Sequence, residues 1–197
     1  MERSRVEVLR DLHRRGGCSV HDVPADGACF YHSVAAFGRV QGDPDQESQE
    51  SRESLEHRSA AVKNVILYHM CKSSMRGRYA RWHQLLHPSY AGGVVAFYRP
   101  RGAYADEIIV RAAVDALNIS LYVISHGDLG ELGEGGGGAR EPHIMEFLPD
   151  PRRCRRKQFN KPQLVVLSLR GEHYRPVRIR SPTDAWVFCR SRESEPA

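Results

Sequence analysis

The sequence lacks any long apolar run and any segment typical of a secretion signal. No apolar stretch approaches the roughly 18 residues that a helix needs to cross a bilayer, and the opening MERSRVEVLR is charged throughout. The five cysteines are an odd set without regular spacing, which argues against a disulfide framework. We therefore expect a soluble, intracellular, cytoplasmic protein with reduced thiols and no membrane partner. A nuclear location, or the host-cell cytoplasm for a viral or bacterial effector, agrees equally with these features.

Internal repeats and a phosphate-binding loop are absent as well. Residues 127–141 are rich in glycine but contain no lysine of the kind that such a loop requires. The 197 residues, 41% hydrophobic and 27% charged, suffice for one domain with a substantial core. We expect a single domain over residues 1–190 and a disordered tail over residues 191–197. The net charge of +5 permits an anionic partner without requiring one.

The first half of the chain favours helices and the second half favours strands. Apolar residues at helical spacing predict helices over residues 2–15, 29–38, 55–70 and 104–118. Residues 18–23 are expected to be extended, and residues 77–93 to form a short helix followed by loops. Strands are predicted at 119–125, 143–148, 163–169 and 173–179, with 184–188 as a candidate for one more. The fold class is therefore α/β (α+β), a small, mainly antiparallel sheet flanked by helices.

One cysteine stands where a turn becomes a helix. Asp26 and Gly27 mark the turn, and the helix is expected to begin at or next to Cys29. A helix N-terminus carries partial positive charge, which favours the thiolate that a cysteine needs in order to attack. The same turn can direct backbone N–H groups at an oxyanion, and Gly27 lets the backbone approach a substrate closely. By position alone, Cys29 is therefore either a nucleophile or a small core residue.

A cysteine nucleophile needs a base that is close in space. Among the ten histidines, His173 stands out because it follows a predicted strand and the Gly171-Glu172 turn and begins the next strand. A strand end holds an imidazole firmly. His173 is therefore the candidate base, against the alternative of an ordinary turn histidine.

Binding of zinc is an alternative role for Cys18 and Cys29. Cys18 and His21, and Cys29 and His32, each have the spacing of a zinc-binding pair. Only residues 22–28 separate the two pairs, which is short for a zinc module, and one pair is expected on a helix while the other is extended. We expect no metal and no other cofactor.

Three segments, in order, resemble the ovarian-tumour (OTU) family of cysteine proteases, which are deubiquitinases. The family signature Asp-Gly-x-Cys, followed by Leu or Phe and then Phe or Tyr, is matched by Asp26, Gly27, Cys29, Phe30 and Tyr31. Its His-Tyr-x-x-Val block is matched by His173, Tyr174 and Val177. Between them, GAYADEIIVRAAVDALNISLYVI is similar to the family's middle segment. The resemblance spans roughly residues 20 to 180.

The resemblance implies a function and a partner. Cys29 would attack the carbonyl of the C-terminal glycine of ubiquitin or a ubiquitin-like modifier, usually in an isopeptide bond to lysine. His173 would act as general base and then general acid, and Asp26 would shape the oxyanion loop. The substrate would contact a further set of residues, namely Gly27, Ala28, Tyr104, Asp106 and Tyr174. Asp106 is equally well placed to cap the predicted helix that follows it.

The sequence departs from the family pattern at two places. Arg175 occupies the position, two residues after the histidine, where the family usually has an Asp or Asn to orient the imidazole. Arginine has no acceptor for an imidazole N–H. Asp22, Asp184 or a backbone carbonyl could supply the missing acceptor for the imidazole. Otherwise the enzyme could work with a dyad of Cys29 and His173 alone. Tyr104 and Ala105 replace the family's tryptophan and glycine, and the tyrosine still offers a flat aromatic wall.

Two rival functions come from other classes. Because of Arg175, the chain could be a catalytically weak or inactive OTU-fold module that binds ubiquitin. The basic run from Arg152 to Lys157 could bind nucleic acid, but aromatic residues are not interleaved with it, so a solvated loop is favoured. The interpretation that we adopt is a thiol-dependent isopeptidase.

Overall fold

The computed structural model describes residues 3–37, 52–90, 92–100, 103–125, 143–149 and 163–191. The chain divides into two compact units. The sheet unit comprises Met1–Val23, Leu121–Glu146 and Leu164–Ala197, and the helical unit comprises Pro24–Ser120 and Phe147–Gln163. The glycine-rich segment, the basic run from Arg152 to Lys157 and all of the predicted tail after Ser191 lie outside the described residues.

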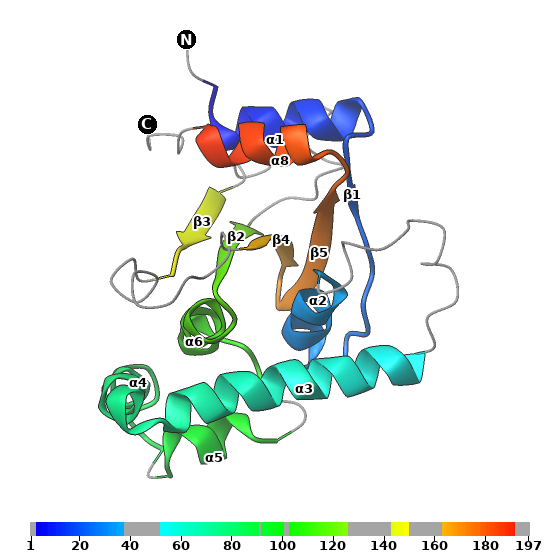
Figure 1. Ribbon diagram of the computed structural model, residues 1–197. Helices are drawn as coiled ribbons and strands as arrows, with labels where there is room; N and C mark the ends of the chain where they lie inside the picture. Colours follow the sequence, from blue (N-terminus) through cyan, green and yellow to red (C-terminus); the bar gives the residue numbers. More distant parts are fainter. Residues whose placement is uncertain are drawn as a thin grey trace. The chain divides into compact units, whose positions relative to one another are not determined.

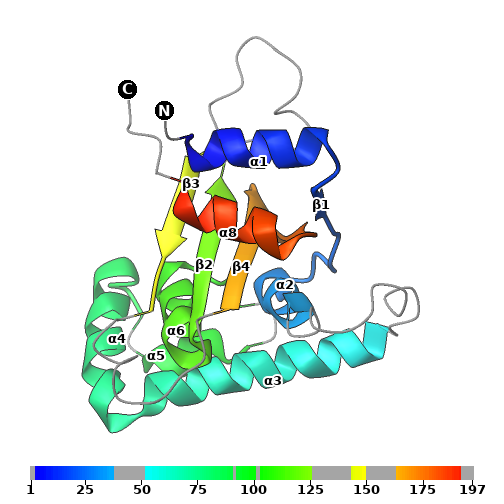
Figure 2. The ribbon, with the colours of Figure 1, turned by 45° about the horizontal axis from the view of Figure 1, so that its top comes forward.

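The described part of the sheet unit contains a five-stranded sheet with the order β1-β5-β4-β2-β3. The strands are β1 (Cys18–Val20), β2 (Ile119–Ser125), β3 (His143–Phe147), β4 (Gln163–Arg170) and β5 (His173–Ile179). β5 runs antiparallel to both β1 and β4, whereas β2 and β4 point the same way and β3 points the opposite way (Figure 2). The sheet is therefore mixed but mainly antiparallel, and the predicted fold class is confirmed.

Helices α1 (Arg5–Arg14) and α8 (Pro182–Arg190) lie side by side on one face of this sheet (Figures 1 and 2). A capping box between Ser4 and Glu7 starts α1, as the helical spacing after residue 2 predicts. The two helices and the strands bury a common apolar cluster, made of Val6, Val8, Leu9, Leu12, Cys18, Tyr122, Ile124, Ile144, Val166, Val177 and Phe188. Burial of these side chains supplies the main driving force for this unit.

The strand suggested at residues 184–188 is wrong, because this segment is the middle of α8. Ser181 accepts a hydrogen bond from the Thr183 N–H and caps the helix, while Pro182 occupies its first position. Phe188 is fully buried and stands edge-on to Tyr122, with 5.0 Å between ring centroids. The short apolar run looked like a strand, but the capping residues before it specify a helix.

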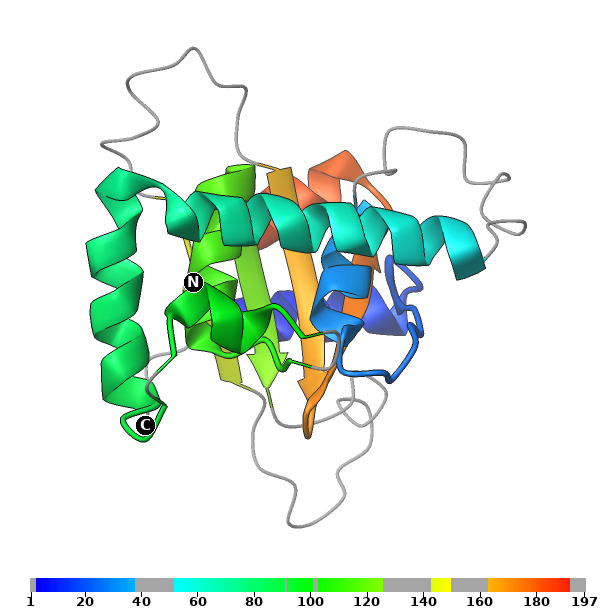
Figure 3. The ribbon, with the colours of Figure 1, turned by 90° about the horizontal axis from the view of Figure 1, so that it is seen from below.

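The helical unit is built around one long helix. It contains α2 (Cys29–Phe37), α3 (Arg52–Cys71), α4 (Ser73–Leu86), α5 (Val94–Tyr98) and α6 (Glu107–Leu117). α3 contacts each of the other four and crosses the unit, with α4 at one end of it (Figure 3). α4 begins earlier than the sequence indicated, because Met75 and Tyr79 are buried and the Tyr79 hydroxyl donates to Asp115 of α6.

No helix among the described residues has the length and apolarity that crossing a membrane requires.

Candidate active site

Cys29 is the first residue of α2, as predicted. Its side chain is only 3% exposed, and Gly27 before it has a φ of +78°, which a residue with a side chain seldom adopts. The first helical hydrogen bond runs from the His32 N–H to the Ala28 carbonyl (3.0 Å). The thiol therefore lies at the positive end of a helix, where a thiolate is stabilised.

Asp26 joins the turn to the helix. Its Oδ1 accepts a hydrogen bond from the Ala28 N–H (3.0 Å), and its Oδ2 lies 3.2 Å from Nε2 of His32. Burial alone would raise the pKa of Asp26, but the hydrogen bonds from Ala28 and His32 outweigh it and hold the pKa below its ordinary value. Asp26 is thus a carboxylate that shapes the turn. Because Ala28 donates to it, oxyanion donors in this loop have to be other N–H groups.

His32 is the residue of this site that sequence reasoning missed. It entered the sequence analysis only as half of a zinc-binding pair, whereas its buried ring contacts Asp26. Cys18 and His21 are engaged elsewhere: Cys18 Sγ donates to the Leu9 carbonyl (4.0 Å), and His21 Nε2 lies 3.0 Å from Ser19 Oγ. Within the described ranges, no group of three or more His, Cys, Asp or Glu side chains could hold a metal.

Asp106 is a helix cap whose carboxylate is fully used within the protein. Its Oδ1 accepts from the N–H groups of Ile108 (3.0 Å) and Ile109 (3.3 Å) at the start of α6. Its Oδ2 lies 2.8 Å from His87 Nε2 and accepts from the Tyr98 hydroxyl. Four partners occupy about as many lone-pair sites as a carboxylate has. The capping alternative is therefore correct, and the predicted contact between Asp106 and substrate is not supported.

Two aromatic residues of the expected substrate set lie in contrasting environments. Tyr104 in the helical unit is 40% exposed and precedes the α6 cap. Tyr174 in the sheet unit is 7% exposed and lies on β5 next to His173, on the opposite face of the strand. Tyr104 can therefore meet a substrate, whereas Tyr174 is a core residue and the prediction that it binds substrate is not supported.

His173 begins β5, as predicted. Gly171, with a φ of +59°, makes the turn from β4, so that Arg170 pairs with His173 across the hairpin. Side chains two apart share a face of a strand, so His173 and Arg175 lie on the same face. His173 itself is half-buried. The strand end thus fixes the backbone of the candidate base.

Asp22 lies across from Arg175. The pairing of β1 with β5 continues for one residue, through a hydrogen bond from the His21 N–H to the Pro176 carbonyl (3.0 Å). The next position brings Asp22 opposite Arg175, and Asp22 Oδ1 lies 3.8 Å from Arg175 Nη1. His173 is a diagonal neighbour of Asp22, a distance of roughly 7–8 Å between backbones that side chains can bridge.

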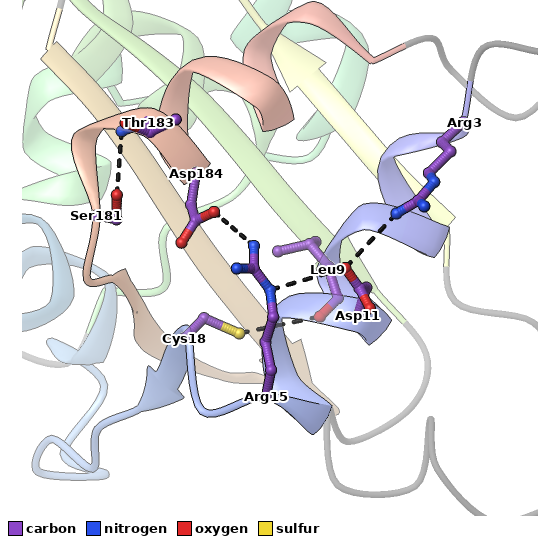
Figure 4. Close-up of polar contacts among 8 residues, drawn as sticks. All are labelled: Arg3, Leu9, Asp11, Arg15, Cys18, Ser181, Thr183 and Asp184. Carbon is purple, nitrogen blue, oxygen red and sulfur yellow. Dashed lines mark hydrogen bonds and ion pairs between the residues drawn. The ribbon is translucent and has the colours of Figure 1, made fainter.

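Asp184 lies at the other end of β5. It contacts Arg15 between α1 and β1 (Figure 4), and a Cβ on Gly17 would lie 3.5 Å from its Oδ2. The residue after Gly17, Cys18, pairs with Ile179. Six residues of strand, about 20 Å, separate Ile179 from His173. Asp184 is therefore not positioned to orient His173, and Asp22 is the acid that remains.

Comparison with known proteins identifies the fold. No family model and no curated protein matches the sequence, but solved OTU domains match the structure. The OTU domain of OTUD1 is 17% identical, covers 89% of this chain and 95% of its own, and superimposes with a TM-score of 0.52. The viral OTU protease of Dera Ghazi Khan virus is 17% identical, covers 85% of this chain and 84% of its own, and has a TM-score of 0.53. An OTU deubiquitinase of Wolbachia pipientis, solved with ubiquitin, is 11% identical, covers 84% of this chain and 98% of its own, and has a TM-score of 0.50. The chain therefore has the OTU fold.

Proposed function

We propose that the chain is a deubiquitinase that hydrolyses isopeptide bonds at the C-terminal glycine of ubiquitin or a ubiquitin-like modifier. The observation that carries this proposal is Cys29 at the first residue of α2, directly after a turn held by a charged Asp26. The OTU fold supports it, because the structures with this fold include proteases and a deubiquitinase bound to ubiquitin.

The proposed reaction uses Cys29 and His173 together. His173 takes the thiol proton, Cys29 Sγ attacks the glycine carbonyl, and backbone N–H groups of the 26–29 loop hold the oxyanion. When the intermediate collapses, His173 protonates the leaving lysine amine, and an acyl-enzyme thioester remains. His173 then deprotonates a water molecule, whose oxygen attacks the thioester carbonyl. The C–S bond breaks, the ubiquitin carboxylate leaves, and His173 returns its proton to Cys29 Sγ.

A panel of substrates tests the proposal. The wild-type chain is incubated with isopeptide-linked di-ubiquitin and with matching conjugates of ubiquitin-like proteins, and the products are resolved by mass. We expect cleavage after the terminal glycine of at least one modifier. Binding of ubiquitin without cleavage of any conjugate would favour the inactive binding module instead.

We further propose that Asp22 orients His173. The Asp22 side chain is 90% exposed, whereas that of Arg175 is 15% exposed, and the 3.8 Å between Asp22 Oδ1 and Arg175 Nη1 is longer than a hydrogen bond. Asp22 can therefore turn from Arg175 to the imidazole without breaking a hydrogen bond to the arginine. Asp22→Ala should lower kcat/KM by about 10-fold or more, at least roughly 1.4 kcal/mol of transition-state stabilisation.

Asp184→Ala is the matched control, because it removes the other acid considered for this role and should leave kcat/KM within about twofold. Arg175→Asp provides a second arm: it restores an acid on the face of His173 and should raise activity. A near-normal rate for Asp22→Ala would contradict the role of Asp22 and favour a dyad or a carbonyl acceptor. A loss of activity in Arg175→Asp would mean that the arginine has a role of its own.

A further inference from the structure

One carboxylate connects the loop before Cys29 to the body of α2. The Ala28 N–H donates to Oδ1 of Asp26, and His32 Nε2 meets Oδ2 at 3.2 Å. His32 lies one helical turn after Cys29, and its side chain is 2% exposed, whereas the Asp26 side chain is 42% exposed. The buried partner in this contact is therefore the histidine, and the exposed carboxylate depends on it for a fixed orientation.

The chemistry of the pair decides where the proton is. An ionised carboxylate only accepts, so Nε2 of His32 carries the hydrogen. Nδ1 of His32 is buried and has no hydrogen-bond partner in the described part of the chain. His32 therefore meets the Asp26 carboxylate with its Nε2–H, which acts as a fixed donor.

We propose that His32 is a positioning residue for the reaction at Cys29. The Nε2–H of His32 fixes the Asp26 carboxylate, and the carboxylate fixes the Ala28 N–H. The peptide units of residues 26–29, which precede the thiol, are thereby held in one arrangement. This inference rests on the proposed function, because it assigns His32 to the oxyanion loop of that reaction.

The expected effect falls on kcat. Donors stabilise an oxyanion well only when they are already oriented before charge develops. Without His32, the exposed Asp26 carboxylate can turn to solvent and release Ala28, and the loop has to be ordered in the transition state. An interaction that strengthens only as charge develops affects the transition state and not the bound ground state, so KM should change little.

Two substitutions separate a positioning role from a merely structural one. In glutamine, the side-chain amide nitrogen is as many bonds from Cα as Nε2 is in histidine, whereas in asparagine it matches Nδ1. His32→Gln keeps a donor for Asp26 and should retain kcat within about threefold. His32→Asn loses that donor and should lower kcat about 10-fold, with KM within about twofold. Both variants remove the ring, so packing loss alone would affect them alike.

A hydrogen-exchange measurement tests the same inference without turnover. The Ala28 amide should exchange about 10-fold faster in His32→Asn than in wild type, and close to the wild-type rate in His32→Gln. If the two His32 variants do not fold, Asp26→Ala takes their place, because Asp26 is partly exposed. This variant should show the same faster exchange of the Ala28 amide. Equal kcat in the two His32 variants, or an Ala28 amide that exchanges equally in Asp26→Ala and wild type, would overturn the inference. If the Ala28 amide exchanges as expected in wild type and in the variants, but the wild type cleaves no substrate, only the proposed function is overturned.

Discussion

Replacing Cys29 by serine is expected to lower kcat/KM for a ubiquitin substrate by at least about 10⁴-fold, because removal of a nucleophile leaves only the catalysis that binding and the oxyanion loop provide. The exchange of sulfur for oxygen is nearly isosteric, so the buried start of α2 should keep its packing. The measurement is steady-state hydrolysis of ubiquitin that carries a fluorescent leaving group at its C-terminus.

Cys71→Ser is the matched control for this experiment. Cys71 is an exposed free thiol at the end of α3 in the same unit, and its loss should leave the rate unchanged. Ubiquitin affinity should be equal in wild type, Cys29→Ser and Cys71→Ser. If Cys29→Ser retains the wild-type rate, the thiol chemistry assigned to the start of α2 is wrong.

Replacing His173 by glutamine is the second large effect that we expect. Glutamine can hydrogen bond but cannot take or give a proton near neutral pH, so both the activation of the thiol and the protonation of the leaving amine are lost. General acid–base catalysis is worth about 10²–10⁴-fold, and kcat/KM should fall within that range. The rate of alkylation of Cys29 by iodoacetamide at neutral pH should fall as well, because less thiolate is present.

His143→Gln controls for the loss of an imidazole in the same unit. His143 begins β3 and is exposed, and its replacement should leave both the hydrolysis rate and the alkylation rate unchanged. Equal effects of His173→Gln and His143→Gln would remove the reason for assigning the base to the start of β5.

Local signals in the sequence predict those parts of the candidate site that depend on neighbouring residues. The Asp-Gly turn predicts the start of α2 at Cys29, and the position of Asp106 before an apolar helix predicts its capping role. The Gly171-Glu172 turn predicts the hairpin that places His173 at a strand end. Each of these features is determined within a few residues of chain.

Features that depend on register or burial were out of reach of the sequence. The pairing of Asp22 with Arg175 follows from the way in which β1 continues along β5, across about 150 residues of chain, so spacing alone could not separate Asp22 from Asp184. The role of His32 depends on which face of α2 turns toward Asp26. Its only signal in the sequence is a three-residue spacing from Cys29, which is also the spacing of a zinc-binding pair. The segment 184–188 is a candidate strand in the sequence because five residues are too few to separate a strand from a buried helix.

The most direct measurement of the central claim is the reaction of the chain with ubiquitin that bears an electrophile in place of its C-terminal carboxylate. Intact mass and peptide mapping would locate the adduct. The account predicts one covalent adduct on Cys29 in the wild type, none in Cys29→Ala, and an unchanged adduct in Cys71→Ser. An adduct on another cysteine, or none with ubiquitin and with every ubiquitin-like probe, would contradict the claim that Cys29 is a nucleophile directed at the modifier's C-terminus.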